Sequence, residues 1–175
     1  MNLSDSVRFD TCSWINLVNC GLLETVLEFL KGQKAIVGAV QIEMNGLYRE
    51  LFDALQSASR CGLCDSEVDP EELQEFVRAE NIGQGEAHSI LACRNQDICF
   101  VCDDRRARQV AERVIGKDKV IGSIGILCSL LATGVLNIEE TLRCLDEMMK
   151  SGGFLPTMDE DYWRRCEAGE ARLKQ

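Results

Sequence analysis

The chain has 175 residues, of which 19 are basic and 29 acidic, so its formal net charge is −10. A chain of this length suits one domain with one core, and we expect a single domain over residues 1–175. Hydrophobic residues make up 46% and charged residues 27%, a composition typical of globular proteins that argues against disorder. The acidic charge excludes a broad electrostatic clamp on nucleic acid, but not an enzyme that holds cations through carboxylates.

Compartment and membrane features are predicted from the N-terminus, the cysteines and one uncharged stretch. Residues 1–9 lack an apolar core preceded by basic residues, so we expect no secretory signal and a cytoplasmic protein. Its ten cysteines are then expected to be reduced, with Cys128 among the small buried hydrophobes. Residues 120–138 carry no charge, but their glycines predict a short strand, a buried helix and a turn rather than a membrane span.

Two cysteine pairs, Cys61/Cys64 and Cys99/Cys102, have the spacing of zinc ligands. Residues three apart on the strand predicted at 97–102 face opposite sides of a sheet, which disfavours a four-thiolate site. We therefore predict neither a structural zinc site nor a redox pair from these cysteines.

Short apolar runs and helical apolar stripes alternate along the chain. In order, they predict a strand at 7–9, helices at 13–20 and 22–30, a strand at 35–37, a helix at 40–55, a loop at 61–69, helices from 70 and over 86–94, a strand at 97–102, a helix over 107–114, a strand at 120–121 with a buried helix behind it, a helix over 138–149 and a short helix from 158. The strands are uniformly apolar, which indicates burial on both faces. The predicted fold is therefore α/β, a three-layer α/β/α sandwich with a central parallel sheet.

Five acidic residues stand where this fold would bring side chains together. Binding sites in open parallel sheets form at the carboxyl ends of strands, which selects Asp10, Asp103 and Asp104. Glu43 and Glu86 lie toward the apolar sides of predicted helices, where an acid has no packing role. Converging carboxylates repel one another, so such a cluster needs bound Mg²⁺ or Mn²⁺, or raised pKa values. Metal-assisted phosphodiester hydrolysis is the usual chemistry of such a cluster.

Each acid also has a structural interpretation, and spacing alone does not decide between the two. Asp10 and Asp104 could cap helices, Glu86 could stabilise a helix N-terminus, and Glu43 could lie exposed. An aspartyl phosphatase is disfavoured, because such enzymes typically have a second acid two residues after the first and Cys12 stands there.

Other polar residues near the acids are candidates for substrate contacts. Arg105 and Arg108 could hold RNA phosphates or form a solvated helix face. Ser123, at the end of a strand, could contact substrate, a water on the metal or a carboxylate. His88 follows Glu86 by two residues on a helix, so we expect it to point away from the acids.

Four segments resemble the PIN-domain nucleases. Residues 10–17, beginning Asp-Thr-Cys-Ser, are similar to the opening Asp-Thr-Ser motif of that family. Residues 85–92, beginning Gly-Glu-Ala, residues 103–108, Asp-Asp-Arg-Arg-Ala-Arg, and residues 122–127, Gly-Ser-Ile-Gly-Ile-Leu, resemble consecutive motifs of one bacterial and archaeal branch. Gly38 stands where the family often has proline, and residues 57–69 depart from the family pattern, so the outer parts of the substrate groove are less well defined.

This resemblance implies the parallel-sheet fold and an Mg²⁺- or Mn²⁺-dependent endoribonuclease, commonly the toxin of a toxin–antitoxin pair. By motif, it implies that Asp10, Glu86 and Asp104 are metal ligands and that Glu43 is a further acid of the catalytic centre. Asp103 is implied to be either a neighbouring ligand or an acid that contacts the ligands without binding the metal. The implied partners are RNA, an antitoxin protein and a second copy of the chain. The alternative is a catalytically inactive PIN-like module that acts through a protein partner.

Overall fold

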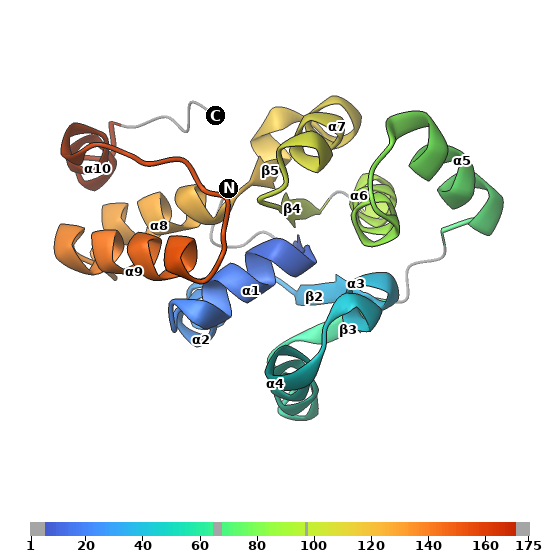
Figure 1. The fold of residues 1–175 in the computed structure, drawn as a ribbon, viewed down its shortest axis with the longest axis horizontal. Helices are drawn as coiled ribbons and strands as arrows, with labels where there is room; N and C mark the ends of the chain where they lie inside the picture. Colours follow the sequence, from blue (N-terminus) through green and yellow to red (C-terminus); the bar gives the residue numbers. More distant parts are fainter. Residues whose placement is uncertain (1–5, 65–67, 97, 171–175) are drawn as a thin grey trace.

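In the computed structural model, which describes residues 6–64, 68–96 and 98–170, five parallel strands form one central sheet (Figure 1). The strands are β1 (Val7–Phe9), β2 (Lys34–Val37), β3 (Gly62–Cys64), β4 (Cys99–Val101) and β5 (Val120–Ile121). Their order across the sheet is β3-β2-β1-β4-β5. The chain therefore builds the sheet outward from β1 on one side, and then returns to place β4 against the other side of β1.

Helices connect and cover these strands. They are α1 (Thr11–Asn19), α2 (Leu23–Phe29), α3 (Gly38–Glu43), α4 (Gly46–Ser57), α5 (Pro70–Glu80), α6 (Gln84–Gln96), α7 (Arg105–Ile115), α8 (Ser123–Ala132), α9 (Ile138–Lys150) and α10 (Glu160–Glu167), with a 3-10 turn η1 at Lys117–Lys119. Figure 1 shows α8, α9 and α10 grouped on one side of the molecule and α5, α6 and α7 on the other.

The alternating side chains of β4 separate two hydrophobic cores. Cys99 and Val101 belong to the larger core, which includes residues of α1, α2, α8, α9 and α10. Phe100 and Cys102 belong to a second core with α6 and α7. Because successive strand residues point to opposite faces, this division confirms the predicted α/β/α sandwich with a parallel sheet.

Two local predictions are wrong. The predicted loop at 61–69 contains β3, which pairs in parallel with β2 through Ile36 and Leu63. The predicted helix at 40–55 is interrupted, because α3 ends at Glu43 and α4 begins at Gly46, whose φ of +48° is left-handed. The predicted strand at 97–102 is confirmed as β4, although Asp97 lies outside the described residues.

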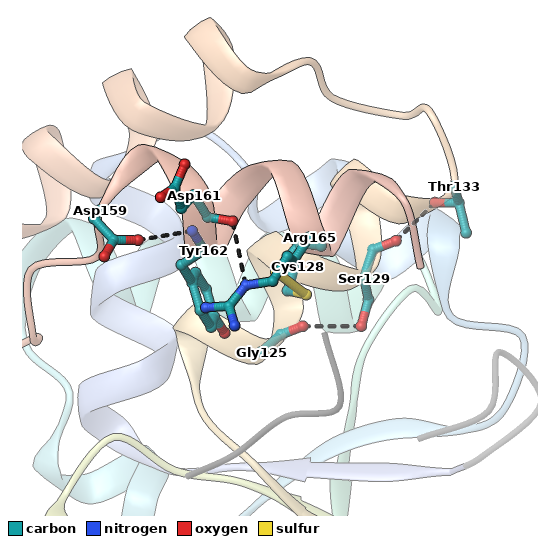
Figure 2. The surroundings of a disulfide bond; sticks show 9 residues. Gly125, Cys128, Ser129, Thr133, Asp159, Asp161, Tyr162 and Arg165 are labelled. Atoms are coloured by element: carbon teal, nitrogen blue, oxygen red, sulfur yellow. Dashed lines mark hydrogen bonds between the residues drawn. A yellow bond between two sulfur atoms is a disulfide. The ribbon is translucent and has the colours of Figure 1, made fainter. Parts of the chain in front are cut away.

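The expectation that all cysteines are free thiols is also wrong in this structure. Cys128 of α8 and Cys166 of α10 form a disulfide across 38 residues of chain, and the other eight cysteines take part in no disulfide. Figure 2 shows Cys128 beneath α10, near Tyr162 and Arg165. The bond joins the last helix to the buried helix behind β5. Ten cysteines offer many pairings, and proximity in the fold selects this one.

The uncharged stretch at 120–138 forms β5, the buried helix α8 and the turn after it, as predicted. No helix within the described residues is long and apolar enough to cross a membrane.

Candidate active site

The strand order creates one switch point, between β1 and β4. β1 and β4 are adjacent and parallel, with Phe9 paired to Val101. Loops that leave the carboxyl ends of these strands diverge to opposite sides, which leaves a crevice where ligands bind in such sheets. Asp10 follows β1 and Asp103 follows β4, so both stand at this position.

Asp10 is the most deeply buried acid of this edge, with 1% of its surface exposed. It caps α1, because its Oδ1 accepts the backbone N–H of Ser13 at 2.7 Å and also the hydroxyl of Ser13. Its Oδ2 is buried without a hydrogen-bond partner. Burial raises the pKa of Asp10 to about 7, and the charge of Asp103 adds to the rise although the hydrogen bonds from Ser13 oppose it. The predicted capping role and an unsatisfied carboxylate oxygen therefore occur in the same residue.

Asp103 is half-buried and held on three sides. The backbone N–H of Ser123 donates to its Oδ1 at 2.7 Å, and the Ser123 hydroxyl donates to Oδ2. The Asn16 amide also donates to Oδ2, at 2.8 Å. A side chain at Gly122 would place its Cβ 2.8 Å from Asp103 Oδ1 and 3.2 Å from Arg108 Nη1. Glycine at 122 thus permits close approach of the β5–α8 turn to this carboxylate.

Glu86 and Glu43 approach the same edge from two helices. Glu86 lies in the first turn of α6 and its Oε2 accepts the Gly83 N–H at 2.7 Å. Burial raises its pKa, and the charges of Asp104 and Glu43 raise it further. Glu43 ends α3 and accepts a hydrogen bond from the Thr11 hydroxyl.

Gly85 makes room for this pair of helices to meet. A Cβ on Gly85 would lie 2.6 Å from Oε1 of Glu43. Only a residue without a side chain fits there while Glu43 keeps its position.

Asp104 caps α7, with its Oδ1 accepting the Ala107 N–H at 2.7 Å. Arg105 follows it and is exposed, and Arg108 is half-buried near Gly122. The predicted substrate residue Ser123 is fully buried and directed at Asp103. Its observed contact positions the carboxylate, while contact with substrate stays a prediction.

Cys12 shows that four of the acids surround one place. This residue of α1 was not singled out for the site from the sequence. Burial raises the pKa of its thiol to about 12, and the charges of Asp10, Glu86, Asp103 and Asp104 raise it further. These acids come from three separate segments, so the fold brings them within electrostatic reach of a single side chain.

The acids do not form a closed metal cage in this arrangement. In residues 6–64, 68–96 and 98–170, no three histidine, cysteine or acidic side chains are close enough to hold one ion together. Each carboxylate instead accepts a hydrogen bond from the protein. The donors to Asp10, Glu86 and Asp104 are local, whereas Glu43 and Asp103 accept from other elements. The donor set is still suited to a hard divalent cation, because it consists of carboxylates, and the buried Oδ2 of Asp10 lacks a partner.

A hollow of about 430 Å³ lies beside Asp103 and Asp104. Its walls include Cys12, Ile15 and Phe154. Phe154 is fully exposed. Its signal in the sequence is a large aromatic residue directly after two glycines, beyond the predicted helix at 138–149.

His88 and the Cys99/Cys102 pair are the residues that the sequence sets apart from the acids. His88 is half-buried in α6, and its Nε2 is buried without a partner. Cys99 and Cys102 lie in different cores, as predicted for opposite strand faces, which agrees with the prediction of no four-thiolate zinc site.

The doubly wound parallel sheet, with carboxylates at its switch point, defines an α/β protein with a ligand site at the carboxyl edge. A family model described as a PIN domain matches residues 6–160, so the chain belongs to the PIN-domain family. The predicted resemblance is confirmed. PIN domains are typically nucleases and generally use divalent metals. No curated protein and no solved structure gave a significant match.

Proposed function

We propose that this protein is an Mg²⁺- or Mn²⁺-dependent endoribonuclease. The observation that carries the proposal is Asp10, a buried acid with one unpartnered oxygen at the switch point of a PIN-domain sheet. A carboxylate in that position is costly to keep charged unless a cation or proton compensates it. A divalent cation is the compensation that also serves phosphodiester chemistry.

The residues that would hold the metal are Asp10, Glu86, Asp103 and Asp104. A bound divalent ion would supply an activated water and neutralise charge on the phosphate. Ser13 fixes Asp10, and Ser123 and Asn16 fix Asp103, so two carboxylates are oriented by hydrogen bonds. Orientation of ligands by such partners typically affects metal affinity and activity strongly.

The substrate side of the proposal rests on the exposed surface beside the acids. Arg105 lines the same hollow as Asp103 and Asp104, and its guanidinium could bind an RNA phosphate, as could that of Arg108. Phe154 offers an exposed ring on which an unpaired base could stack. These features favour single-stranded RNA as substrate.

Two protein partners belong to this proposal. A chain with a net charge of −10 attracts RNA weakly, and we propose that a second copy brings basic side chains of the two chains together in one groove. The exposed apolar side chains Ile42 and Leu47, 80% and 68% accessible, offer a surface for that copy or for an antitoxin.

The test is cleavage of a fluorescently labelled single-stranded RNA by purified protein with Mg²⁺, with Mn²⁺ and with EDTA. We expect cleavage only with metal, and a loss of about a hundredfold or more in Asp10→Asn and Asp104→Asn. The matched control is Asp159→Asn, which alters an exposed helix cap on α10 and should cleave normally. Cleavage that persists in EDTA, or an Asp10→Asn enzyme as active as wild type, contradicts the proposal. A folded wild type that never cleaves RNA would favour the inactive interaction module.

A further inference from the structure

A second hollow lies at the opposite, amino-terminal edge of the sheet. It has a volume of about 720 Å³ and includes Lys34 and Gly62, which begin β2 and β3. Arg8 of β1 lines it from the sheet, and Gln96 lines it from the end of α6. The acidic site stands at the carboxyl ends of the same strands, so the two places are separate.

The lining of this hollow is basic in a strongly acidic chain. Four cationic side chains line it, namely Arg8, Lys31, Lys34 and Arg60, and no acidic residue is among the described lining residues. Three glutamines and a serine add neutral hydrogen-bonding groups, namely Gln33, Gln56, Gln96 and Ser59. Such a wall suits an anion that also carries polar groups.

The buried side chain of Arg8 is the main feature of this hollow that points to an anion. Only 3% of its surface is exposed. Its Nη2 donates to Oε1 of Gln96 at 2.9 Å and its Nη1 donates to the Val7 carbonyl at 3.2 Å, while Nε is buried without a partner. No carboxylate of the described residues lies within ion-pair distance of it. A buried guanidinium whose partners among the described residues are neutral is an incomplete anion site, because none of those partners compensates its charge.

The neighbouring cations differ in how far they are already paired. Arg60 binds Glu24 and Glu28, which do not line the hollow. Lys31 and Lys34 form no ion pair with a described residue. Burial raises the pKa of the nearby Cys61 thiol to about 12, and the positive charges of Arg8 and Lys34 oppose this rise. Arg8 and Lys34 therefore give the hollow a positive potential that no ion pair among the described residues neutralises.

We propose that this hollow binds a small phosphorylated ligand, up to the size of a mononucleotide, with its phosphate held by Arg8 and Lys34. A phosphate is favoured over a single carboxylate because several cations converge and a guanidinium can contact two phosphate oxygens. The volume lies within the range of sites for small molecules. This inference does not depend on the proposed nuclease activity, because none of the metal-site acids lines the hollow.

The test is calorimetry and thermal unfolding of the full chain in EDTA at constant ionic strength, with inorganic phosphate, adenosine 5′-monophosphate and adenosine as probes. We expect saturable binding of phosphate and of the nucleotide, tighter for the nucleotide, and none of adenosine. Lys34→Gln should raise the dissociation constants of phosphate and of the nucleotide about tenfold. The matched control Lys117→Gln removes an exposed lysine of η1, and should bind like the wild type.

Arg8→Met is a second variant, which tests whether phosphate binding needs the guanidinium. It fills similar space without a charge, so we expect a melting temperature in phosphate-free buffer equal to or above that of the wild type. The shift that phosphate causes in the wild type should disappear in this variant. The proposal is overturned if phosphate does not bind the wild type, if it binds Lys34→Gln as tightly, or if Arg8→Met keeps the phosphate shift. Equal competition by an RNA oligomer without a terminal phosphate would instead assign the hollow to the RNA backbone and also overturn it.

Discussion

Asp10→Asn should remove a pH dependence of stability that the buried carboxyl creates. The variant keeps an oxygen that can accept the Ser13 N–H, and asparagine is as good a helix cap as aspartate. It replaces the unpartnered Oδ2 by an uncharged amide nitrogen. The cap is therefore conserved while the buried charge is removed.

The sign and size follow from the raised pKa of Asp10. The folded carboxyl binds its proton until about pH 7, whereas its usual pKa is 3.8, so the folded state is favoured at low pH. That stabilisation is complete below 3.8 and is lost as pH rises through 7. The full loss is on the order of 4 kcal/mol, of which about 2–3 kcal/mol falls between about pH 5 and about pH 8.

The assay is urea unfolding of the metal-free protein at about pH 5 and about pH 8. The difference in the free energy of unfolding between the two pH values should be smaller in Asp10→Asn by about 2–3 kcal/mol. Asp159→Asn serves as the control, because Asp159 caps α10 in the same way but is exposed. If Asp10→Asn and wild type show the same pH difference, the carboxyl of Asp10 is not desolvated as described, and the argument for a cation at that position fails with it.

Three other changes test separate parts of the structure. Gly85→Ala places a Cβ 2.6 Å from the carboxylate of Glu43, so that carboxylate must move, and we expect RNA cleavage to fall about tenfold while thermal unfolding shows a folded protein. Phe154→Ala should leave the free energy of unfolding within about 0.5 kcal/mol of wild type. It should also raise KM for single-stranded RNA several-fold at unchanged kcat, and recovery in Phe154→Trp would distinguish base stacking from packing. Cys166→Ser should lower the free energy of unfolding by about 4 kcal/mol without reductant, and dithiothreitol should abolish the difference by opening the bond to Cys128 in the wild type.

Much of the fold follows from sequence because four strands are short runs that are mainly apolar, apart from Arg8 and Lys34, and are largely buried in the sheet. β1 and β4, which decide where the site lies, are read directly from such runs. The acids that follow them are then placed by topology, because parallel strands end at one edge. Asp10 and Asp103 could be assigned to that edge before any coordinates.

What escaped prediction depends on tertiary contacts. β3 is a short edge strand with a glycine, and only its pairing with β2 makes it a strand. The helical stripe from Val40 to Leu55 continues across the break because the periodicity of apolar residues does not register the left-handed backbone of Gly46. The Cys128–Cys166 bond joins positions 38 residues apart, and no spacing rule selects it. Phe154 was passed over because exposure is a property of the folded surface.

The central strand carries two buried charges of opposite sign that do not neutralise each other. Arg8 is 3% exposed and Asp10 is 1% exposed, and each has a side-chain atom that is buried without a partner. No ion pair joins them among the described residues. Removing one partner of a buried ion pair typically costs about 3–5 kcal/mol, so leaving both charges unpaired is a departure from what stability alone favours. Such departures concentrate at functional sites. Because Arg8 faces the basic hollow and Asp10 ends the strand at the acidic edge, we propose a different counter-ion for each, an anion at one edge of the sheet and a divalent cation at the other.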